Sequence, residues 1–470
     1  MKMETNLPVA VIGAGPVGLA AAAQLVSRGL TPIVFERGGS VGASMLEWGH
    51  VRVFSPWEYN IDSAARTLLE AAGWDVPEPA ALPTGRQIVE EYLRPLSEVP
   101  QIAPHLKLSA SVSAITRVGL DKVSNQGRES APFEIRWTDS EGVEQATIVG
   151  AVIDASGTWK RPNPIGVDGL PVLGEKAASA FIDYGIPDVL GHDREKFANK
   201  TVLVVGSGHS AINAALGLLS LQDSEPGTRV LWALRRNRIE RLLGGGLNDQ
   251  LPERGALGMA AKKAIDTGRL QVLAPFAAHR LVPTDDKLAV VGALGQTQMT
   301  LMVDRIVVAT GFRPDLGMLS ELRISVDPAT EAPPALSPLI DPNFHSCGTV
   351  PPHGVDELGH PEPGFYIVGS KSYGRAPTFL MATGFEQARS VVAELAGDPA
   401  AAREVHLVLP ETGVCSVSFG DEAASSTSCC GGPTTSTTSC CVADEVAKVE
   451  GEAGCGCGTP VAPRQLVEIA

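Results

Sequence analysis

The amino-acid sequence predicts an α/β fold in which one strand–turn–helix unit occurs twice. A glycine-rich turn, Gly13-Ala14-Gly15-Pro16-Val17-Gly18, stands between the apolar run 8–12 and the alanine-rich run 19–25. A second turn, Gly206-Ser207-Gly208-His209-Ser210-Ala211, follows the apolar run 201–205 and opens a predicted helix over about residues 211–221. A glycine turn between a buried strand and a helix is typical of dinucleotide-binding folds. The sequence therefore predicts two Rossmann-like domains and two dinucleotides, an arrangement that usually brings a nicotinamide donor to a flavin acceptor.

The first turn has the composition of a phosphate-binding loop. Glycine permits a sharp turn and close approach of the backbone, while the N–H groups and dipole of the following helix favour an anion. The next predicted strand, residues 31–35, ends at Glu36, where a carboxylate can accept hydrogen bonds from ribose hydroxyls. The alternative without a binding function is a surface glutamate after an ordinary glycine-rich turn. The candidate binding residues of this unit are Gly13, Gly15, Pro16, Gly18, Glu36 and Arg37.

The second turn differs from the first in the charge of the residues that follow its second strand. The predicted strand 229–234 ends at Arg235-Arg236 instead of at an acid. Two guanidinium groups can bind a 2′-phosphate, which favours NADPH over NADH, although a solvated basic loop is the alternative. His209 lies inside the turn and either contacts phosphate or caps the helix. The candidate residues of this unit are Gly206, Ser207, Gly208, His209, Ser210, Ala211, Arg235 and Arg236.

Three further apolar segments predict how the two domains are connected. Residues 149–157 and 303–311 each read as a strand ending in a small-residue turn, where the chain can cross between domains. Residues 364–370 read as one more buried strand, ending at Gly369-Ser370, and residues 379–396 as a helix able to direct its positive end at a flavin. We therefore predict a discontinuous first domain, 1–160 and 335–411, around a second domain at 161–334.

These segments together resemble the two-dinucleotide flavoproteins, and most closely the class B flavin-dependent monooxygenases, over about residues 7–398. The resemblance implies that the Gly13 turn and Glu36 bind FAD, and that the Gly206 turn and Arg235 bind NADPH. It also implies a hydroxyl contact from Ser370, where related disulfide reductases place an aspartate on the ribityl chain. Trp48 follows a stretch similar to the family's second glycine turn, so it either contacts the flavin or packs in the core.

The resemblance further implies a reaction. NADPH would reduce FAD, reduced FAD would activate oxygen as a C4a-peroxyflavin, and one oxygen atom would pass to a small substrate. The sequence assigns no catalytic side chain to this chemistry. Two alternatives stay open: an NADPH-dependent disulfide or metal reductase that uses the C-terminal cysteines, and a non-enzymatic flavoprotein that binds a soft metal.

The C-terminal segment 412–470 is predicted to be a disordered tail rich in cysteine. Large apolar residues are sparse there, yet seven of the eight cysteines of the chain fall within it. Adjacent thiols suit zinc, copper(I) or trivalent arsenic, which makes Cys429, Cys430, Cys440 and Cys441 candidate ligands. A redox-active or regulatory tail and a tail without function are the alternatives. Isolated histidines, among them His353 and His360, have no second ligand nearby in sequence and are predicted to be solvated or packing residues.

The composition of the chain restricts the classes of molecule that it can bind. The formal net charge of −15 argues against nucleic acid, whose phosphates require a basic surface. No apolar run is long enough to span a membrane, and the apolar start is interrupted by glycines and a proline, so we expect a cytoplasmic enzyme. The expected partners are a small-molecule substrate and oxygen, and a homo-oligomer remains open.

Overall fold

The computed structural model describes residues 7–236, 252–344, 350–376 and 380–407. All of them belong to one of two compact units, Met1–Phe419, while the other unit, Gly420–Ala470, lies outside the described residues. We find in the described ranges no helix that combines the length and the apolar character needed to cross a bilayer.

The first sheet is five-stranded, with the order β16-β7-β1-β2-β3, and every neighbouring pair is parallel. Its strands come from both ends of the described chain, and crossover connections join its parallel neighbours. The bounds are β1 Val9–Ile12, β2 Pro32–Phe35, β3 Leu106–Lys107, β7 Ala151–Asp154 and β16 Phe365–Ile367.

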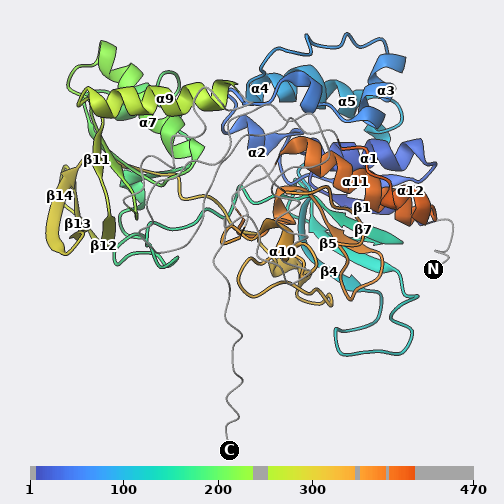
Figure 1. Cartoon of the computed structure of the whole chain (residues 1–470). Coiled ribbons are helices and arrows are strands. Elements are labelled where there is room, and N and C mark those ends of the chain that lie inside the picture. Colours follow the sequence, from blue (N-terminus) through green and yellow to red (C-terminus); the bar gives the residue numbers. More distant parts are fainter. Residues whose placement is uncertain (1–6, 237–251, 345–349, 377–379, 408–470) are drawn as a thin grey trace, which may run out of the picture. The chain divides into compact units, whose positions relative to one another are not determined.

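Alternate residues of β1 face two different layers. Val9 and Val11 pack in a core with the helices α1 (Pro16–Ser27) and α11 (Met381–Leu395). Ala10 and Ile12 pack instead with an antiparallel sheet formed by β4 (Ser111–Arg117), β5 (Phe133–Thr138) and β6 (Glu144–Val149). Figure 1 shows α1 and α11 over one face of the parallel sheet, and β4 and β5 on the other. Burial on both faces explains why these strands are continuously apolar.

Short helices complete this part of the chain. Three of them begin at side-chain caps. Asp62 accepts a hydrogen bond from the Ala65 N–H at the start of α3, Thr84 forms a capping box with Gln87 at the start of α4, and Asp398 accepts a hydrogen bond from the Ala401 N–H at the start of α12. The helical elements are α2 Ala43–Leu46, η1 Trp57–Tyr59, α3 Ser63–Ala71, α4 Gly85–Gln87, η2 Ile88–Leu93, α5 Arg94–Glu98, η3 Ala103–His105, η6 Gly317–Leu319, α10 Ser337–Ile340, η7 Gly369–Lys371 and α12 Pro399–Arg403.

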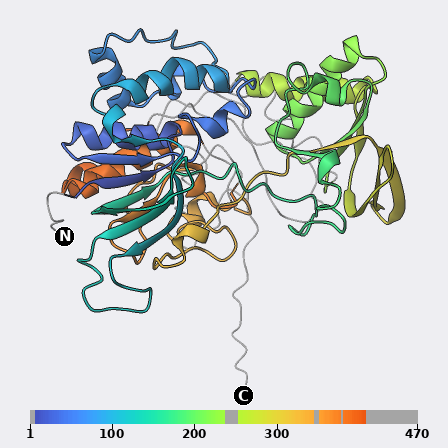
Figure 2. The same cartoon turned by 180° about the vertical axis from the view of Figure 1, so that it is seen from behind.

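The second sheet has the order β11-β10-β9-β15-β8 and is also parallel throughout. Val202 and Val204 of β9 pack with α7 and α9, whereas Leu203 packs with a second antiparallel sheet, β12-β13-β14. Figure 2 shows these elements from behind. The bounds are β8 Ile182–Tyr184, β9 Thr201–Val205, β10 Arg229–Ala233, β11 Gln271–Leu273, β12 Phe276–Pro283, β13 Leu288–Leu294, β14 Thr297–Val303, β15 Arg305–Val308, η4 Ser179–Phe181, α6 Arg194–Phe197, α7 His209–Ser224 and α9 Pro252–Asp266.

The two sheets repeat one plan. In each, the strand before the glycine turn, β1 or β9, is central, the following strand is on one side, and the strand that ends in a small-residue turn, β7 or β15, is on the other. A three-stranded antiparallel sheet precedes β7 and β15 alike. The predicted α/β class with two Rossmann-like units is confirmed, while the domain boundaries at 160, 334 and 411 stay predictions. Several element boundaries differ by a few residues. Helix α7, for example, begins at His209 and ends at Ser224, whereas the sequence predicted about 211–221, so part of the predicted turn is helix.

Candidate functional site

The three glycines of the first turn have different surroundings. Gly13 has φ +99°, and a Cβ there would lie 2.8 Å from the carbonyl oxygen of Ala155, after β7. A Cβ on Gly18 would lie 1.9 Å from the carbonyl oxygen of Gly13. At Gly15, by contrast, no atom of the described residues lies within 4 Å of the Cβ position. The first and third glycines are thus needed for packing, and the second faces free space.

The second turn repeats this arrangement. Gly206 has φ +135°, and a Cβ there would lie 2.2 Å from the carbonyl oxygen of Ala309, after β15. The Cβ position of Gly208 has no described atom within 4 Å. Ala211 stands at the third position and is fully buried, so this turn accommodates one methyl group where the first does not.

The helix N-termini at both turns suit an anionic group. Gly15 is the N-cap of α1 and Gly208 that of α7, and neither helix has a side-chain cap in the described part of the chain. Backbone N–H groups in the first turn of a helix have no partner within the helix, and the helix dipole favours a negative charge there. The turns therefore fit two pyrophosphate groups: each has a helix N-terminus without a side-chain cap, an uncovered second glycine and no acidic residue in the first helical turn.

Glu36 lies beside the first turn, directly after β2. Its Oε2 accepts a hydrogen bond of 2.8 Å from the Ala14 N–H, and its Oε1 accepts one of 2.7 Å from the Gly38 N–H. Each carboxylate oxygen has a second lone pair, which could accept a hydroxyl hydrogen. Arg37, the next residue, is exposed. The carboxylate is thus fixed at the position that the strand–turn–helix pattern predicts for a ribose contact.

The turn after β16 brings Gly369 and Ser370 to the same edge of the sheet. Gly369 has φ +73°, and its N–H donates a 2.7 Å hydrogen bond to Gln387 Oε1 of α11. The Ser370 hydroxyl oxygen lies 3.6 Å from the Cβ position of Gly157, in the small-residue turn after β7. Gly13, Gly157 and Ser370, which are far apart in sequence, are therefore grouped around the ends of three adjacent strands.

Two residues that sequence reasoning missed hold this edge together. Lys371 Nζ lies 2.7 Å from Asp154 Oδ2 and 3.1 Å from Ser156 Oγ, and both charged side chains are buried. The signal for Asp154 was present as a charged residue at the end of an otherwise apolar strand. Lys371 carried no local signal, because its partner is 217 positions away.

Trp48 packs against other aromatic and backbone groups. Its ring centroid is 6.3 Å from that of Trp159, which in turn is 4.7 Å from the Phe312 ring. A Cβ on Gly85 would come within 2.9 Å of the Trp48 ring, so the indole also lies close against the start of α4. These contacts are consistent with the alternative in which Trp48 packs in the core. A flavin contact of Trp48 stays a prediction.

The basic residues of the second unit follow β10 as predicted. The pKa of Arg235 is lowered, first by desolvation and second by the neighbouring charge of Arg236. An anion bound between them would relieve that repulsion. His209 is the first residue of α7, with Gly208 as the N-cap, and its ring lies edge-on to Phe54 at 5.2 Å. Its predicted phosphate contact stays a prediction.

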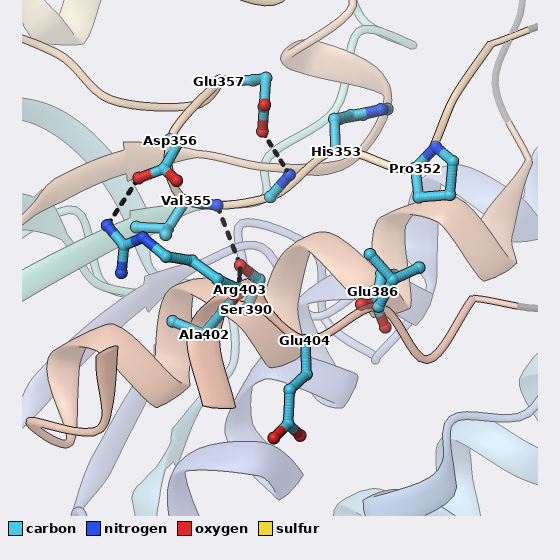
Figure 3. A pocket seen from close by; sticks show the side chains of 12 residues that line it. Pro352, His353, Val355, Asp356, Glu357, Glu386, Ser390, Ala402, Arg403 and Glu404 are labelled. Atoms are coloured by element: carbon cyan, nitrogen blue, oxygen red, sulfur yellow. Dashed lines mark hydrogen bonds and ion pairs between the residues drawn. The ribbon is translucent and has the colours of Figure 1, made fainter. Parts of the chain in front are cut away.

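A separate cavity of about 120 Å³ lies between the segment 352–357, α11, the end of α12 and the two residues that follow it (Figure 3). Its charged groups have partners from the chain itself. Figure 3 shows Asp356 paired with Arg403 at 2.6 Å and Glu357 accepting the Gly354 N–H at 2.8 Å. His353 at its edge is buried, which lowers its pKa. We assign this cavity no catalytic role, because it does not include any residue of the two turns.

His353 is joined to the Gly369 turn through Gln387. The Gln387 Nε2 lies 2.8 Å from His353 Nε2, and its Oε1 accepts the Gly369 N–H. His353 is thus a buried, hydrogen-bonded residue of the core. The sequence predicted that the isolated histidines are either solvated or packed in the interior, and His353 is packed in the interior.

The predicted metal ligands Cys429, Cys430, Cys440 and Cys441 lie outside the described residues. Within the described ranges, no three His, Cys, Asp or Glu side chains are grouped as ligands of one metal ion would be. A metal or metalloid at the tail cysteines therefore stays a prediction.

Comparison with known proteins identifies the family. Residues 10–338 match the family model described as pyridine nucleotide-disulphide oxidoreductase. The chain is 25% identical over 217 residues to a human protein named putative dimethylaniline monooxygenase [N-oxide-forming] 6, a match that covers 45% of this chain but only 38% of the human one. The predicted resemblance to flavin-containing monooxygenases and the predicted oxidoreductase class are thereby confirmed.

Solved structures confirm the two-dinucleotide fold. A bacillithiol disulfide reductase from Bacillus cereus is similar with a TM-score of 0.62 and 19% identity, covering 83% of this chain and 99% of that one. An ornithine N-hydroxylase from Kutzneria sp. 744 is similar with a TM-score of 0.54 and 16% identity, again over 83% and 99%. Because the family model covers more than half of the 470 residues, the protein belongs to the pyridine nucleotide-disulphide oxidoreductase family.

Proposed function

We propose that this protein is an NADPH-dependent, FAD-containing monooxygenase that transfers one oxygen atom from O2 to a small molecule. The observation that carries the proposal is the pair of equivalent turns at Gly13 and Gly206, each open at its second glycine, in a chain similar to a curated monooxygenase. Two open turns suit two dinucleotides, and the similarity favours oxygen as the final electron acceptor.

FAD is assigned to the first turn. Gly13, Gly15, Pro16 and Gly18 would place backbone N–H groups on its pyrophosphate, and Glu36 would accept hydrogen bonds from its ribose. Gly369 and Ser370 are at the same sheet edge, where the ribityl chain would pass. The bound flavin supplies the hydride acceptance and oxygen activation, whereas these residues bind it, orient it and exclude water.

NADPH is assigned to the second turn. Gly206, Gly208 and the N-terminus of α7 would bind its pyrophosphate. The preference for the 2′-phosphate rests on Arg235 and Arg236, because two adjacent guanidinium groups suit a dianion, and the charge of Arg236 already contributes to the lowered pKa of Arg235.

A second candidate function is an NADPH-dependent disulfide or metalloid reductase. It is favoured by the seven cysteines of residues 412–470, which could accept electrons from the flavin or present a soft metal ion to it. The segment 1–411 has a single cysteine, Cys347, so it lacks a Cys-x-x-Cys pair to accept hydride equivalents first.

The two functions predict different electron acceptors. The test reconstitutes the full chain with FAD and follows NADPH oxidation with either oxygen or a low-molecular-weight disulfide as acceptor. A full-length variant with Cys429, Cys430, Cys440 and Cys441 changed to serine serves as the control. The monooxygenase proposal expects oxygen-dependent oxidation that the serine variant retains. Disulfide-dependent oxidation that the variant loses would instead support the reductase, and no NADPH oxidation with either acceptor would exclude both.

A further inference from the structure

Three arginines lie just beyond the carboxyl ends of three parallel strands. Arg161 follows β7, Arg313 follows β15 and Arg375 follows β16. Ligands of α/β proteins bind at these strand ends, because the loops there leave crevices. The three residues come from segments that are distant in the sequence, so their convergence is a property of the fold.

Backbone and side-chain contacts hold the three arginines in one region. The Arg313 N–H donates a 3.0 Å hydrogen bond to the carbonyl oxygen of Arg161. The Arg313 Nε lies 2.8 Å from Asn163 Oδ1, and its Nη2 lies 3.2 Å from the Gly169 carbonyl oxygen. A Cβ on Gly169 would lie 3.9 Å from Arg313 Nη2 and 3.4 Å from Arg375 Nη2. The Arg313 and Arg375 guanidinium groups therefore face the same glycine.

Two of the three arginines form long ion pairs with acidic residues. Arg375 Nη1 is 3.6 Å from Glu331 Oε1, and Arg161 Nη1 is 3.4 Å from Asp315 Oδ1. Both separations exceed the 2.7–2.9 Å typical of a strong charge-assisted hydrogen bond. The pKa of Arg313 is lowered, first by desolvation and next by the charge of Arg375, with a smaller opposing effect of Glu331. Among the described residues, Arg313 is hydrogen-bonded to Asn163 and Gly169 and not to a carboxylate, in a chain whose formal net charge is −15.

We propose that Arg161, Arg313 and Arg375 bind an oxyanion group, a carboxylate or a phosphate, of a small-molecule ligand. The planar guanidinium fork matches both groups, and three forks from separate segments would fix one oxygen-rich end of the ligand. The proposal rests on the proposed function in one respect: the ligand is the substrate to be oxygenated. The alternative source of the same chemistry is a phosphate of the nicotinamide cofactor.

The test uses glutarate as the anionic probe and glutaramide as its neutral counterpart, on the FAD-loaded full chain. Binding can be followed by tryptophan fluorescence, since Trp159 stands two residues before Arg161 and contacts Phe312. We expect saturable binding of glutarate and none of glutaramide. Arg161→Met and Arg375→Met should each weaken it about tenfold, the loss of one charged hydrogen bond. Arg136→Met, an exposed arginine of β5 paired with Glu134, should leave it unchanged.

A second variant distinguishes anion binding by the three arginines from a purely structural role. Glu331→Gln removes the carboxylate paired with Arg375 and should increase the affinity for glutarate severalfold. If the arginines only stabilise the loops, the affinity for glutarate should not increase. Equal binding of glutarate and glutaramide, or an unchanged affinity in Arg161→Met and Arg375→Met, would overturn the proposal.

Two further measurements show whether the bound anion belongs to the substrate or to the nicotinamide cofactor. If NADP+ displaces glutarate and Arg375→Met raises the KM for NADPH, the cofactor phosphate occupies the site and the substrate proposal falls. If NADP+ and glutarate bind independently, the substrate proposal stands. FAD binding and NADPH-dependent flavin reduction, recorded on the same samples, show whether the proposed function fails separately from this site.

Discussion

The ammonium nitrogen of Lys371 lies 2.7 Å from the carboxylate of Asp154, and the two side chains are 1% and 0% exposed. This ion pair joins the end of β7 to the turn after β16, two of the strand ends around the predicted FAD site. A buried pair is costly to desolvate, and removing one partner leaves the other charge unpaired in the interior.

We predict that Lys371→Met lowers the free energy of unfolding by about 3–5 kcal/mol, because Asp154 loses its cation. The double variant Lys371→Met, Asp154→Asn should recover most of that loss, since it leaves no unpaired charge. Urea unfolding of the full chain measures both. The control is Lys262→Met, whose exposed pair with Asp266 should contribute no more than about 1 kcal/mol. A single variant as stable as the unchanged protein would contradict this account.

The glycines of the first turn should respond differently to the same substitution. Gly13→Ala places a methyl group 2.8 Å from the Ala155 carbonyl at φ +99°, so it should lower stability and cofactor binding together. Gly15→Ala meets no described atom within 4 Å, so stability should change by no more than about 0.5 kcal/mol. If pyrophosphate occupies that space, FAD affinity should nevertheless fall by tenfold or more. Thermal unfolding without FAD and FAD titration distinguish the two effects, and undiminished FAD binding by Gly15→Ala would argue against the assignment.

The second turn allows an independent prediction about cofactor choice. Arg235→Ala with Arg236→Ala should raise the KM for NADPH by at least about tenfold, because the 2′-phosphate loses its charged partners. The KM for NADH, which lacks that phosphate, should stay the same. Steady-state oxidation of both cofactors measures the ratio. An unchanged NADPH preference would identify the two arginines as an ordinary basic loop.

His360 makes stability depend on pH. Its Nδ1 accepts the Ser325 N–H at 3.3 Å, its buried Nε2 has no hydrogen-bond partner among the described residues, and burial lowers its pKa to about 4. The unfolded chain therefore binds the proton more readily, so stability is complete above pH 6.5 and falls as the pH drops toward about 4. The loss is about 3 kcal/mol across this window. His360→Asn should remove that part of the pH dependence in parallel urea titrations, and an identical pH dependence of the two proteins would disprove it.

Local patterns predicted much of this structure, and long-range contacts account for what they missed. The strand–turn–helix pattern placed Gly13, Gly206 and Glu36 correctly in the fold, because glycine requirements and strand ends are local properties. The pairing of Lys371 with Asp154 and the convergence of Arg161, Arg313 and Arg375 depend on which strands become neighbours in space. The antiparallel sheets β4-β5-β6 and β12-β13-β14 were also not predicted, since their exposed faces give only a weak apolar alternation.

In the proposed function, electrons from NADPH pass through FAD to oxygen. The most direct test reduces the FAD-loaded full chain with NADPH under anaerobic conditions, mixes it rapidly with oxygenated buffer and follows the flavin absorbance. We expect oxidised flavin to return through a transient species whose spectrum differs from those of both the reduced and the oxidised forms. Reoxidation in one step without such a species, and faster with a disulfide than with oxygen, would contradict it and favour the reductase.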